Sequence, residues 1–398
     1  MEMNKFVIEQ RKALAEKIAS DLEKGDSIFQ NRIAYGRTQE VLNAVTGKPY
    51  KGINALQIMQ AGKDKGYKDM RWISDSQLQD ATDEKGEKIY VKKGEKGVKV
   101  EYWDYQETVY KKDKDGRELT ETRTDKKTGK TYQARIPETF IDENGVERVK
   151  KINRVGGPKI SSYTVFNIEQ LKGIPKDICA NPPLPVRDMD EDIPELYSIR
   201  ENAQIKSEIA IFEDAQEKSF YDRDKDEIHL RPMESYNSKA EFYADMMKNI
   251  SHATGKENRL NRYSLEKTKP GHDSKEALTA ELSAVFTQAK YGVALSPEDE
   301  NNAVDEYGKK WATMIREDAN KLFAAAYAAD RANSYIERNM IDREEVRAIK
   351  KERESVNKVA EKAVKKSKEQ GKTKTATKKR SLTVKAKEQS RSAERTRK

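Results

Sequence analysis

Three stretches in the first half of the chain combine lysine, glycine and aromatic residues, which are the residue types that hold single-stranded nucleic acid. They span residues 43–54, 92–103 and 163–170. Aromatic faces stack on bases, lysines follow the phosphates, and glycine lets the main chain approach a phosphate closely. The predicted DNA-binding residues are Lys48, Tyr50, Lys51, Asn54, Trp72, Lys92, Lys93, Lys96, Tyr102, Trp103 and Asn167.

The same residues also have an ordinary structural interpretation. The segment Lys-Gly-Glu-Lys-Gly at 93–97 is typical of a polar turn before a strand. Most aromatic residues of a folded domain belong to its core. Residue types alone therefore leave both interpretations open.

The order of these stretches resembles the N-terminal domain of the ArdC family of antirestriction proteins, which also occurs in some plasmid primases. The family pattern Asn-x-x-Thr-Gly-Lys-x-Tyr-x-Gly-x-Asn is matched at 43–54, Lys-Gly-Glu-Lys-Gly at 93–97 and Val-Phe-Asn-x-x-Gln at 165–170. The resemblance spans residues 5–175 and implies binding of single-stranded DNA without strong sequence preference. A stretch with three turn signals, residues 106–160, is longer than expected for the family and predicts inserted hairpins.

The second half of the chain resembles the zincin-like metallopeptidase domain of the same family over residues 220–290. The catalytic core of such a domain is His-Glu-x-x-His on a helix, where the two histidines hold zinc and the glutamate is the general base. Aligning His252 with the second histidine places Lys248 at the first ligand and Asn249 at the base. The motif is therefore degenerate.

Neither substitution suits the chemistry of the family. An ammonium group has no lone pair for a metal, and a carboxamide does not take a proton from water near neutral pH. Catalytic zinc usually has three protein ligands. We expect no catalytic residues, no zinc or other cofactor and no peptidase activity; any metal would have to use His252 and Glu281.

Two glutamates compete for the position of the third family ligand. On the helix predicted from residue 273 to 290, Glu276 lies opposite the apolar stripe, whereas Glu281 lies on its flank. We therefore expect Glu281 to point inward and to pair with Lys248, so that an ammonium replaces the charge of the metal. The alternative is that both side chains face solvent.

The remaining histidines and the single cysteine indicate no further site. His229 lies on a predicted strand as a hydrogen-bonded structural residue, and His272 lies in a predicted solvated loop. Cys179 is alone, so an internal disulfide is excluded. No apolar run approaches the length of a membrane span, and the N-terminus lacks a signal peptide, so we expect a cytoplasmic protein without membrane contact.

The formal charge of +9 is concentrated at one end of the chain. Residues 351–398 contain 18 Lys and Arg against 6 Asp and Glu, whereas the rest contains 60 against 63. This basic tail has too few large apolar residues to fold alone, and it is expected to contact phosphates in a salt-dependent way. A merely solubilising terminus is the alternative.

Periodicity and capping signals predict the elements that position these residues. Helices are expected at 5–24, 195–206, 239–254, 273–290 and 300–337, and strands at 209–212 and 227–230. The predicted class is α+β. The predicted domains are 1–178 for DNA binding with the hairpins at 106–160, a linker at 179–194, a mainly helical zincin-like domain at 195–340, and a charged helix with the tail at 341–398.

The sequence therefore predicts a single-stranded-DNA-binding protein of a plasmid, conjugative element or phage, with an antirestriction or DNA-protecting role and an inactive peptidase-like domain. One alternative is a scaffold whose zincin-like domain binds a protein partner. A second is a metallohydrolase with a rearranged zinc site that includes His252 and Glu281.

Overall fold

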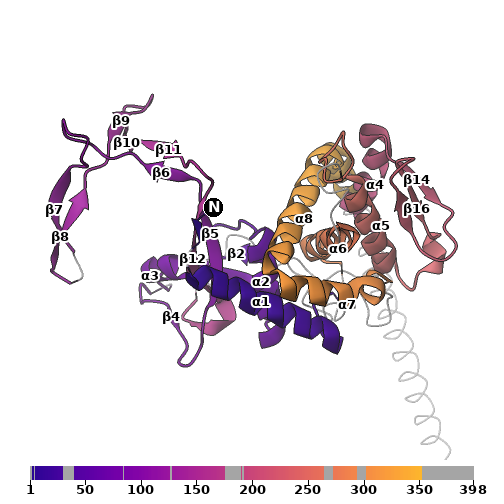
Figure 1. The fold of residues 1–398 in the computed structure, drawn as a ribbon. Helices are drawn as coiled ribbons and strands as arrows, with labels where there is room; N and C mark the ends of the chain where they lie inside the picture. Colours follow the sequence, from indigo (N-terminus) through magenta and orange to yellow (C-terminus); the bar gives the residue numbers. More distant parts are fainter. Residues whose placement is uncertain are drawn as a thin grey trace, which may run out of the picture. The chain divides into compact units, whose positions relative to one another are not determined.

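The structure is a computed structural model, and it describes residues 2–3, 5–29, 40–83, 85–125, 128–174, 190, 192–263, 272–293 and 302–351. Cys179, most of the predicted linker and nearly all of the basic tail lie outside these residues, as do the side chains of His272 and Asp273. In the described part of the chain, no helix combines the length and the apolar character of a membrane span. The fold is α+β, as predicted (Figure 1).

The N-terminal elements form a five-stranded sheet with helices. Its central strand β12 pairs with β5 and β3 in antiparallel and with β1 in parallel orientation, and β2 runs parallel to β3. The bounds are β1 (Glu2–Met3), α1 (Lys5–Lys24), β2 (Leu42–Asn43), α2 (Gly52–Lys65), β3 (Arg71–Ser74), α3 (Asp75–Asp80), β4 (Tyr90–Val91), β5 (Val98–Asp104), β12 (Lys159–Asn167), the 3-10 helix η1 (Ile168–Gln170) and β13 (Leu171–Lys172).

Between β5 and β12 the chain forms the predicted hairpins, which are labelled in Figure 1. The pairs are β6 (Gln106–Thr108) with β11 (Lys151–Asn153), β7 (Thr120–Thr124) with β8 (Thr131–Arg135), and β9 (Thr139–Ile141) with β10 (Glu147–Val149). Two of the turns are alike: the carboxylates of Asp113 and Asp142 accept main-chain N–H bonds, and Gly116 and Gly145 have positive φ. Each of these turns is a three-residue hairpin loop, and its own aspartate side chain and glycine stabilise it.

The second half is mainly helical, with a small sheet in the order β14-β16-β15. The bounds are α4 (Pro194–Ser207), β14 (Ala210–Glu213), β15 (Phe220–Asp222), β16 (Glu227–Leu230), the 3-10 helix η2 (Met233–Ser235), α5 (Lys239–Ala253), α6 (His272–Tyr291), α7 (Asn302–Glu317) and α8 (Ala319–Asn339). Helix α4 is hydrogen-bonded to the residues that follow α8. Ser198 Oγ donates to the carboxylate of Glu345 at 2.9 Å.

The prediction of one long helix over residues 300–337 is wrong. The chain breaks between α7 and α8 at Asp318, whose side chain accepts from the N–H of Asn320 at 2.9 Å. An aspartate in this role is a helix N-cap, and it starts α8 in a new direction.

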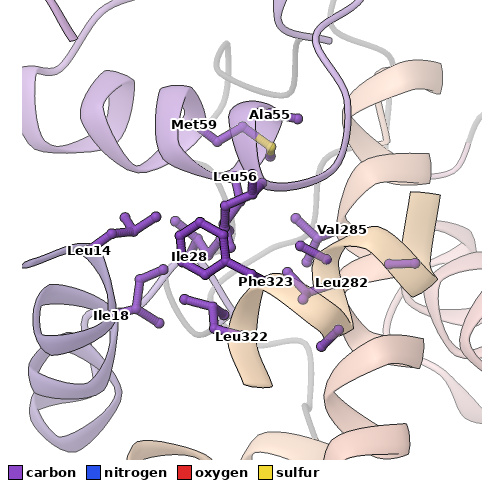
Figure 2. Close-up of a cluster of buried hydrophobic side chains, with 14 of the residues drawn as sticks. Leu14, Ile18, Ile28, Ala55, Leu56, Met59, Leu282, Val285, Leu322 and Phe323 are labelled. Carbon is purple, nitrogen blue, oxygen red and sulfur yellow. The ribbon is translucent and has the colours of Figure 1, made fainter. Parts of the chain in front are cut away.

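A single hydrophobic core joins helices from both halves of the chain. Leu14 and Ile18 of α1 and Leu56 of α2 lie with Leu282 of α6 and Leu322 of α8 (Figure 2), and all five are buried. The helices of this cluster therefore do not divide into two cores at the predicted linker. The predicted domain boundaries mark where the sequence changes character, while the apolar faces on either side share one interior.

A buried ion pair lies in the same region. Arg11 of α1 donates to both carboxylate oxygens of Glu101 on β5, at 2.7 and 2.8 Å, and its guanidinium lies 4.2 Å from the ring centre of Phe323 on α8. Such a bidentate pair fixes orientation as well as distance. It links α1, β5 and α8 within this core.

Candidate nucleic-acid interface and zincin-like site

The three stretches at 43–54, 92–103 and 163–170, called the blocks below, meet at one end of the sheet. Asn43 pairs in register with Trp72, and Trp72 pairs with Asn167, on three neighbouring strands. The loop 92–97 joins them, because Gln170 Nε2 donates to the main-chain oxygen of Lys96 at 3.0 Å. The sequence spacing thus brings together segments that are more than a hundred residues apart.

The amides of these blocks hold main chain in place. Asn54 exchanges two 2.8 Å hydrogen bonds with the main chain of Glu101, and Asn43 Oδ1 accepts from the N–H of Thr46 at 2.9 Å. Asn167 caps η1 by accepting from the N–H of Glu169 at 2.8 Å, and its own amide donates to Asp69. Asn167 is fully buried, so the prediction that it contacts DNA is wrong in this structure, whereas Asn54 is partly buried and its contact with DNA stays a prediction.

The aromatic candidates differ in accessibility. Trp72 is fully buried in the core, so it cannot stack on a base, and that prediction is wrong. Tyr50 is half-buried: its burial raises its pKa to about 12, and its hydroxyl accepts from Asn43 at 3.3 Å. Trp103 donates its indole N–H to Glu101 at 2.8 Å, which leaves Tyr102 as the more exposed ring.

The predicted lysines are all exposed, and three of them share one loop. Lys92, Lys93 and Lys96 lie between β4 and β5, whereas Lys48 and Lys51 lie between β2 and α2. Tyr102 lies towards the other end of β5, roughly 15–20 Å along the strand from the lysine loop at about 3.3 Å per residue. The structure therefore groups the loop lysines with the sheet end where the blocks meet, and it separates Tyr102 from them.

Tyr90 is an exposed aromatic residue that sequence analysis missed. It precedes the lysine loop on β4, its side chain is 55% exposed, and Lys172 Nζ lies 5.9 Å from its ring centre. Its neighbour Ile89 is buried in a small core. Successive side chains of a strand point to opposite faces, so an apolar Ile89 that faces the core predicts an outward-facing Tyr90. This alternation is the signal that could have identified Tyr90.

The degenerate motif lies on α5 and faces α6. Lys248 Nζ is 3.4 Å from Glu281 Oε2 and 3.8 Å from Asp245 Oδ1, and the side chains of Lys248 and Glu281 are 13% and 2% exposed. The ion pair expected between Lys248 and Glu281 is present. Asn249 is buried and donates to the main-chain oxygen of Asp245 one turn earlier, at 3.0 Å, so its amide is held by its own helix.

A second cation–carboxylate pair adjoins the first. Arg262 donates to both oxygens of Glu276, at 2.6 and 3.1 Å, and to Thr254 and the main chain of Ser251. His252 Nδ1 lies 3.4 Å from Glu276. Burial alone would raise the pKa of Glu276, but the bond with His252 and the charge of Arg262 lower it to about 2. Glu281 points inward as expected, and Glu276, which was expected to lie opposite the apolar stripe, is buried as well and is paired with Arg262.

The donor set does not fit a catalytic zinc ion. Each carboxylate already has a protein cation, and Lys248 stands where the family places a ligand. No cluster of three or more His, Cys, Asp or Glu side chains suited to a metal occurs among the residues that the structure describes. His229, on β16, is hydrogen-bonded to Asp214 at 2.8 Å, as expected of a structural histidine.

Two family models match the chain. One, described as the N-terminal domain of anti-restriction factor ArdC, matches residues 9–135; the other, described as a zincin-like metallopeptidase, matches residues 200–328. Among solved structures, the metal-free crystal structure of the antirestriction ArdC protein from plasmid R388 has a TM-score of 0.56 at 23% identity, covering 83% of this chain and 97% of that chain. The Mn(II)-bound structure gives 0.56 at 21% identity. At these identities the likeness shows the fold.

The chain is also similar to three curated proteins. Two are named DNA primase TraC, both from Escherichia coli, with 27% and 26% identity over 81% of this chain. The chain spans only 26% and 19% of their lengths. The third, named uncharacterized protein y4eC, from Sinorhizobium fredii, is 23% identical over 77% of this chain and 84% of its own length.

Proposed function

This chain belongs to the ArdC family, with the family's N-terminal domain followed by its zincin-like domain, and on that premise we propose that it binds single-stranded DNA through the loop 92–97. The setting is a plasmid, conjugative element or phage, where the protein protects DNA against restriction. Its zincin-like domain is not a peptidase. The names of the relatives, an antirestriction protein and DNA primases, agree with a role on DNA.

The exposed lysine loop is the observation that carries the DNA proposal. Lys92, Lys93 and Lys96 are exposed on one short loop, which follows the exposed ring of Tyr90, and the Lys92 ammonium donates to the main-chain oxygen of Glu169 at 2.7 Å. Single strands are bound without sequence preference by two components: lysines that follow the phosphates and an aromatic face on which the bases stack. The surface would take a flexible strand whose bases are free to stack, rather than a duplex.

The absence of peptidase activity is supported by the chemistry of the degenerate site. Peptide hydrolysis by a zincin needs a metal-bound water and a general base. Lys248 offers an ammonium at a ligand position, and the amide of Asn249 is turned into its own helix. Both side chains are engaged in a hydrogen bond or an ion pair. The domain thus has the helices of a peptidase, but the residues at these two positions are not those of the reaction.

The DNA proposal is tested by fluorescence anisotropy with a labelled single-stranded oligonucleotide. The triple substitution Lys92→Glu, Lys93→Glu and Lys96→Glu is compared with Lys111→Glu, Lys112→Glu and Lys114→Glu, which change the same charge at exposed hairpin positions. Each variant is made with and without residues 352–398. We expect the loop variant to lose affinity and salt dependence, and the hairpin variant to keep both, because counterion release follows the lysines at the phosphates.

The outcomes assign binding to a part of the chain. If shortened chains with and without the loop substitutions bind equally well, the loop proposal is wrong. If all binding disappears with residues 352–398, binding belongs to the tail. A duplex of the same sequence is the control for strand preference.

The peptidase proposal is tested by metal analysis of protein supplemented with zinc and then freed of excess metal. We expect no stoichiometric zinc. A full equivalent, lost on Glu281→Gln, would support the rearranged metallohydrolase instead.

A further inference from the structure

The outer face of the small sheet in the second half carries three stacked rings. His229 of β16 lies between Phe212 of β14 and Phe220 of β15, with ring centres 5.3 and 4.8 Å apart and interplanar angles of 23° and 18°. The strand registers pair both phenylalanines with His229. The opposite face carries buried Ile211 and Ile228, so the pleat of the sheet turns the rings outward.

The two phenylalanines are exposed to an unusual degree. Phe212 is 43% and Phe220 is 49% exposed, although each belongs to a paired strand. We refer to Phe212, Phe220 and His229 as the ring face. Adjacent exposed aromatic rings on an ordered sheet are typical of an interaction surface.

Carboxylates surround the ring face. Asp214 is bonded to His229 Nδ1, and Glu227 Oε2 lies 3.5 Å from His229 Nε2. Asp222 follows Phe220 on the same side of β15, and main-chain N–H bonds from the turn, that of Lys225 first, hold its pKa below the usual range. Lys225 lies 3.8 Å from Asp222 and offsets part of this charge. Residues 208–231 contain eight Asp and Glu against four Lys and Arg, so the surface favours cations.

Aromatic faces bordered by carboxylates suit lysine and arginine side chains. The rings attract the cation and the stem packs on them, while the carboxylates pair with the charge. A phosphate backbone is repelled by the same carboxylates, so this surface does not suit DNA. The expected occupant is a flexible, strongly basic segment of polypeptide.

The chain itself contains such a segment. Residues 352–398 have 17 Lys and Arg against 6 Asp and Glu, and they follow directly on the last described residue. Forty-seven residues of polypeptide, at roughly 3.3 Å each when extended, exceed the width of a domain of this size several-fold. The segment is present at a high effective concentration because it is covalently attached.

We propose that the ring face is a docking site for the chain's own basic tail, residues 352–398. Docking withholds the tail from other anions, and a DNA strand bound to the chain releases it by competing for its lysines. The docking itself is independent of the proposed function, whereas its release by DNA rests on it.

The test is carbodiimide cross-linking of the full chain at low ionic strength, which joins paired carboxylates and lysines and is mapped by mass spectrometry. We expect links from Asp214, Asp222 and Glu227 to lysines of the tail. The double substitution Phe212→Ser and Phe220→Ser is expected to reduce them several-fold. Phe140→Ser, which changes a phenylalanine of similar exposure on hairpin strand β9, is expected to leave them unchanged.

Three outcomes would overturn docking. They are an absence of these links in the unsubstituted chain, links spread evenly over acidic residues of the hairpins, and links that persist in the double variant. A mixture of isotope-labelled and unlabelled chains separates links within one chain from links between copies, and links only between copies also contradict the proposal.

Circular dichroism of each variant monitors folding, and Asp214→Asn with Glu227→Gln removes charge without exposing new surface if the phenylalanine variant unfolds. That pair cannot form links at positions 214 and 227, so its readout is the link from Asp222, which is likewise expected to weaken. Single-stranded DNA added before the carbodiimide then tests release. Links that persist while anisotropy shows the DNA to be bound leave docking intact and contradict only the competition, whereas links that persist with no DNA bound reflect a failure of DNA binding.

Discussion

At the scale of single residues, the zincin-like site is defined by two carboxylates that each have their own cation. Lys248 neutralises Glu281, and Arg262 neutralises Glu276. A buried carboxylate without a partner is costly, whereas the pair together is close to neutral in its effect on stability. Lys248 and Arg262 therefore each place a positive charge beside a buried carboxylate.

Removal of Lys248 should destabilise the fold. We expect Lys248→Met to lower the free energy of unfolding by about 3 kcal/mol or more, because Glu281 would remain buried and charged. The double variant Lys248→Met with Glu281→Gln should recover most of this loss. Urea denaturation of the four proteins in the cycle measures the coupling, and equal losses in the single and double variants would contradict it.

Acid stability should depend on Glu276. Its pKa is lowered to about 2 from the ordinary 4.5, so its contribution to stability is fully present above pH 4.5 and is lost as the pH falls towards 2. We expect Glu276→Gln to make the free energy of unfolding less dependent on pH in this window. Unfolding monitored at several pH values checks this, with exposed Glu143→Gln on a hairpin turn as the control.

The sequence predicted single residues unevenly. Lys248, Asn249 and His252 were found by aligning the helix with the motif of the family that it resembles, and helical spacing then placed Lys248 and His252 on one face. The role of Glu276 was missed because it depends on Arg262, which approaches from a loop that periodicity does not describe. Trp72 was misplaced since composition does not distinguish a buried indole from an exposed one.

At the scale of elements, the glycines and amides of the N-terminal blocks build the end of the sheet. Gly97 shows this directly. A Cβ atom at this position would lie 2.8 Å from the main-chain oxygen of Val165 on β12. The close approach of β5 to β12 therefore accounts for the glycine at the end of the segment 93–97, whether or not the lysines of this segment contact DNA.

Substitution of Gly97 should separate the packing role of this glycine from any contact that the neighbouring lysines make. We expect Gly97→Ala to cost about 1–3 kcal/mol of stability through overpacking against β12. Lys99→Ala, at an exposed position two residues later, should have little effect. Thermal unfolding compares the two, and an unchanged melting temperature for Gly97→Ala would contradict the packing role.

Four helices, α1, α4, α5 and α6, and two strands were predicted from sequence within a residue or two, because their caps and periodicity are local signals. The break at Asp318 was missed although an aspartate is a common N-cap, since the apolar pattern continues on both sides of it. β15 was missed because a three-residue strand has too little alternation to detect.

At the scale of the whole molecule, the shared core couples the two halves of the sequence. Leu56 of α2 and Leu282 of α6 are both fully buried in it. A sequence pattern shows that each helix has an apolar face, but it does not show which face covers which. The sequence therefore predicted a linker at 179–194 but not the core that the helices on either side of it share.

The shared core should unfold as one unit. We expect Leu56→Ala and Leu282→Ala each to cost about 2–5 kcal/mol and each to shift the same single transition. Differential scanning calorimetry measures this. Two resolved transitions, each moved by only one of the substitutions, would show that the halves unfold independently.

The shared core also has a consequence for the gene. A nonsense mutation between codons 178 and 272 spares the whole coding sequence of the N-terminal half, yet the product lacks α6 and α8, which cover α1 and α2. The helices beyond α5 can therefore be lost only together with the half that they cover.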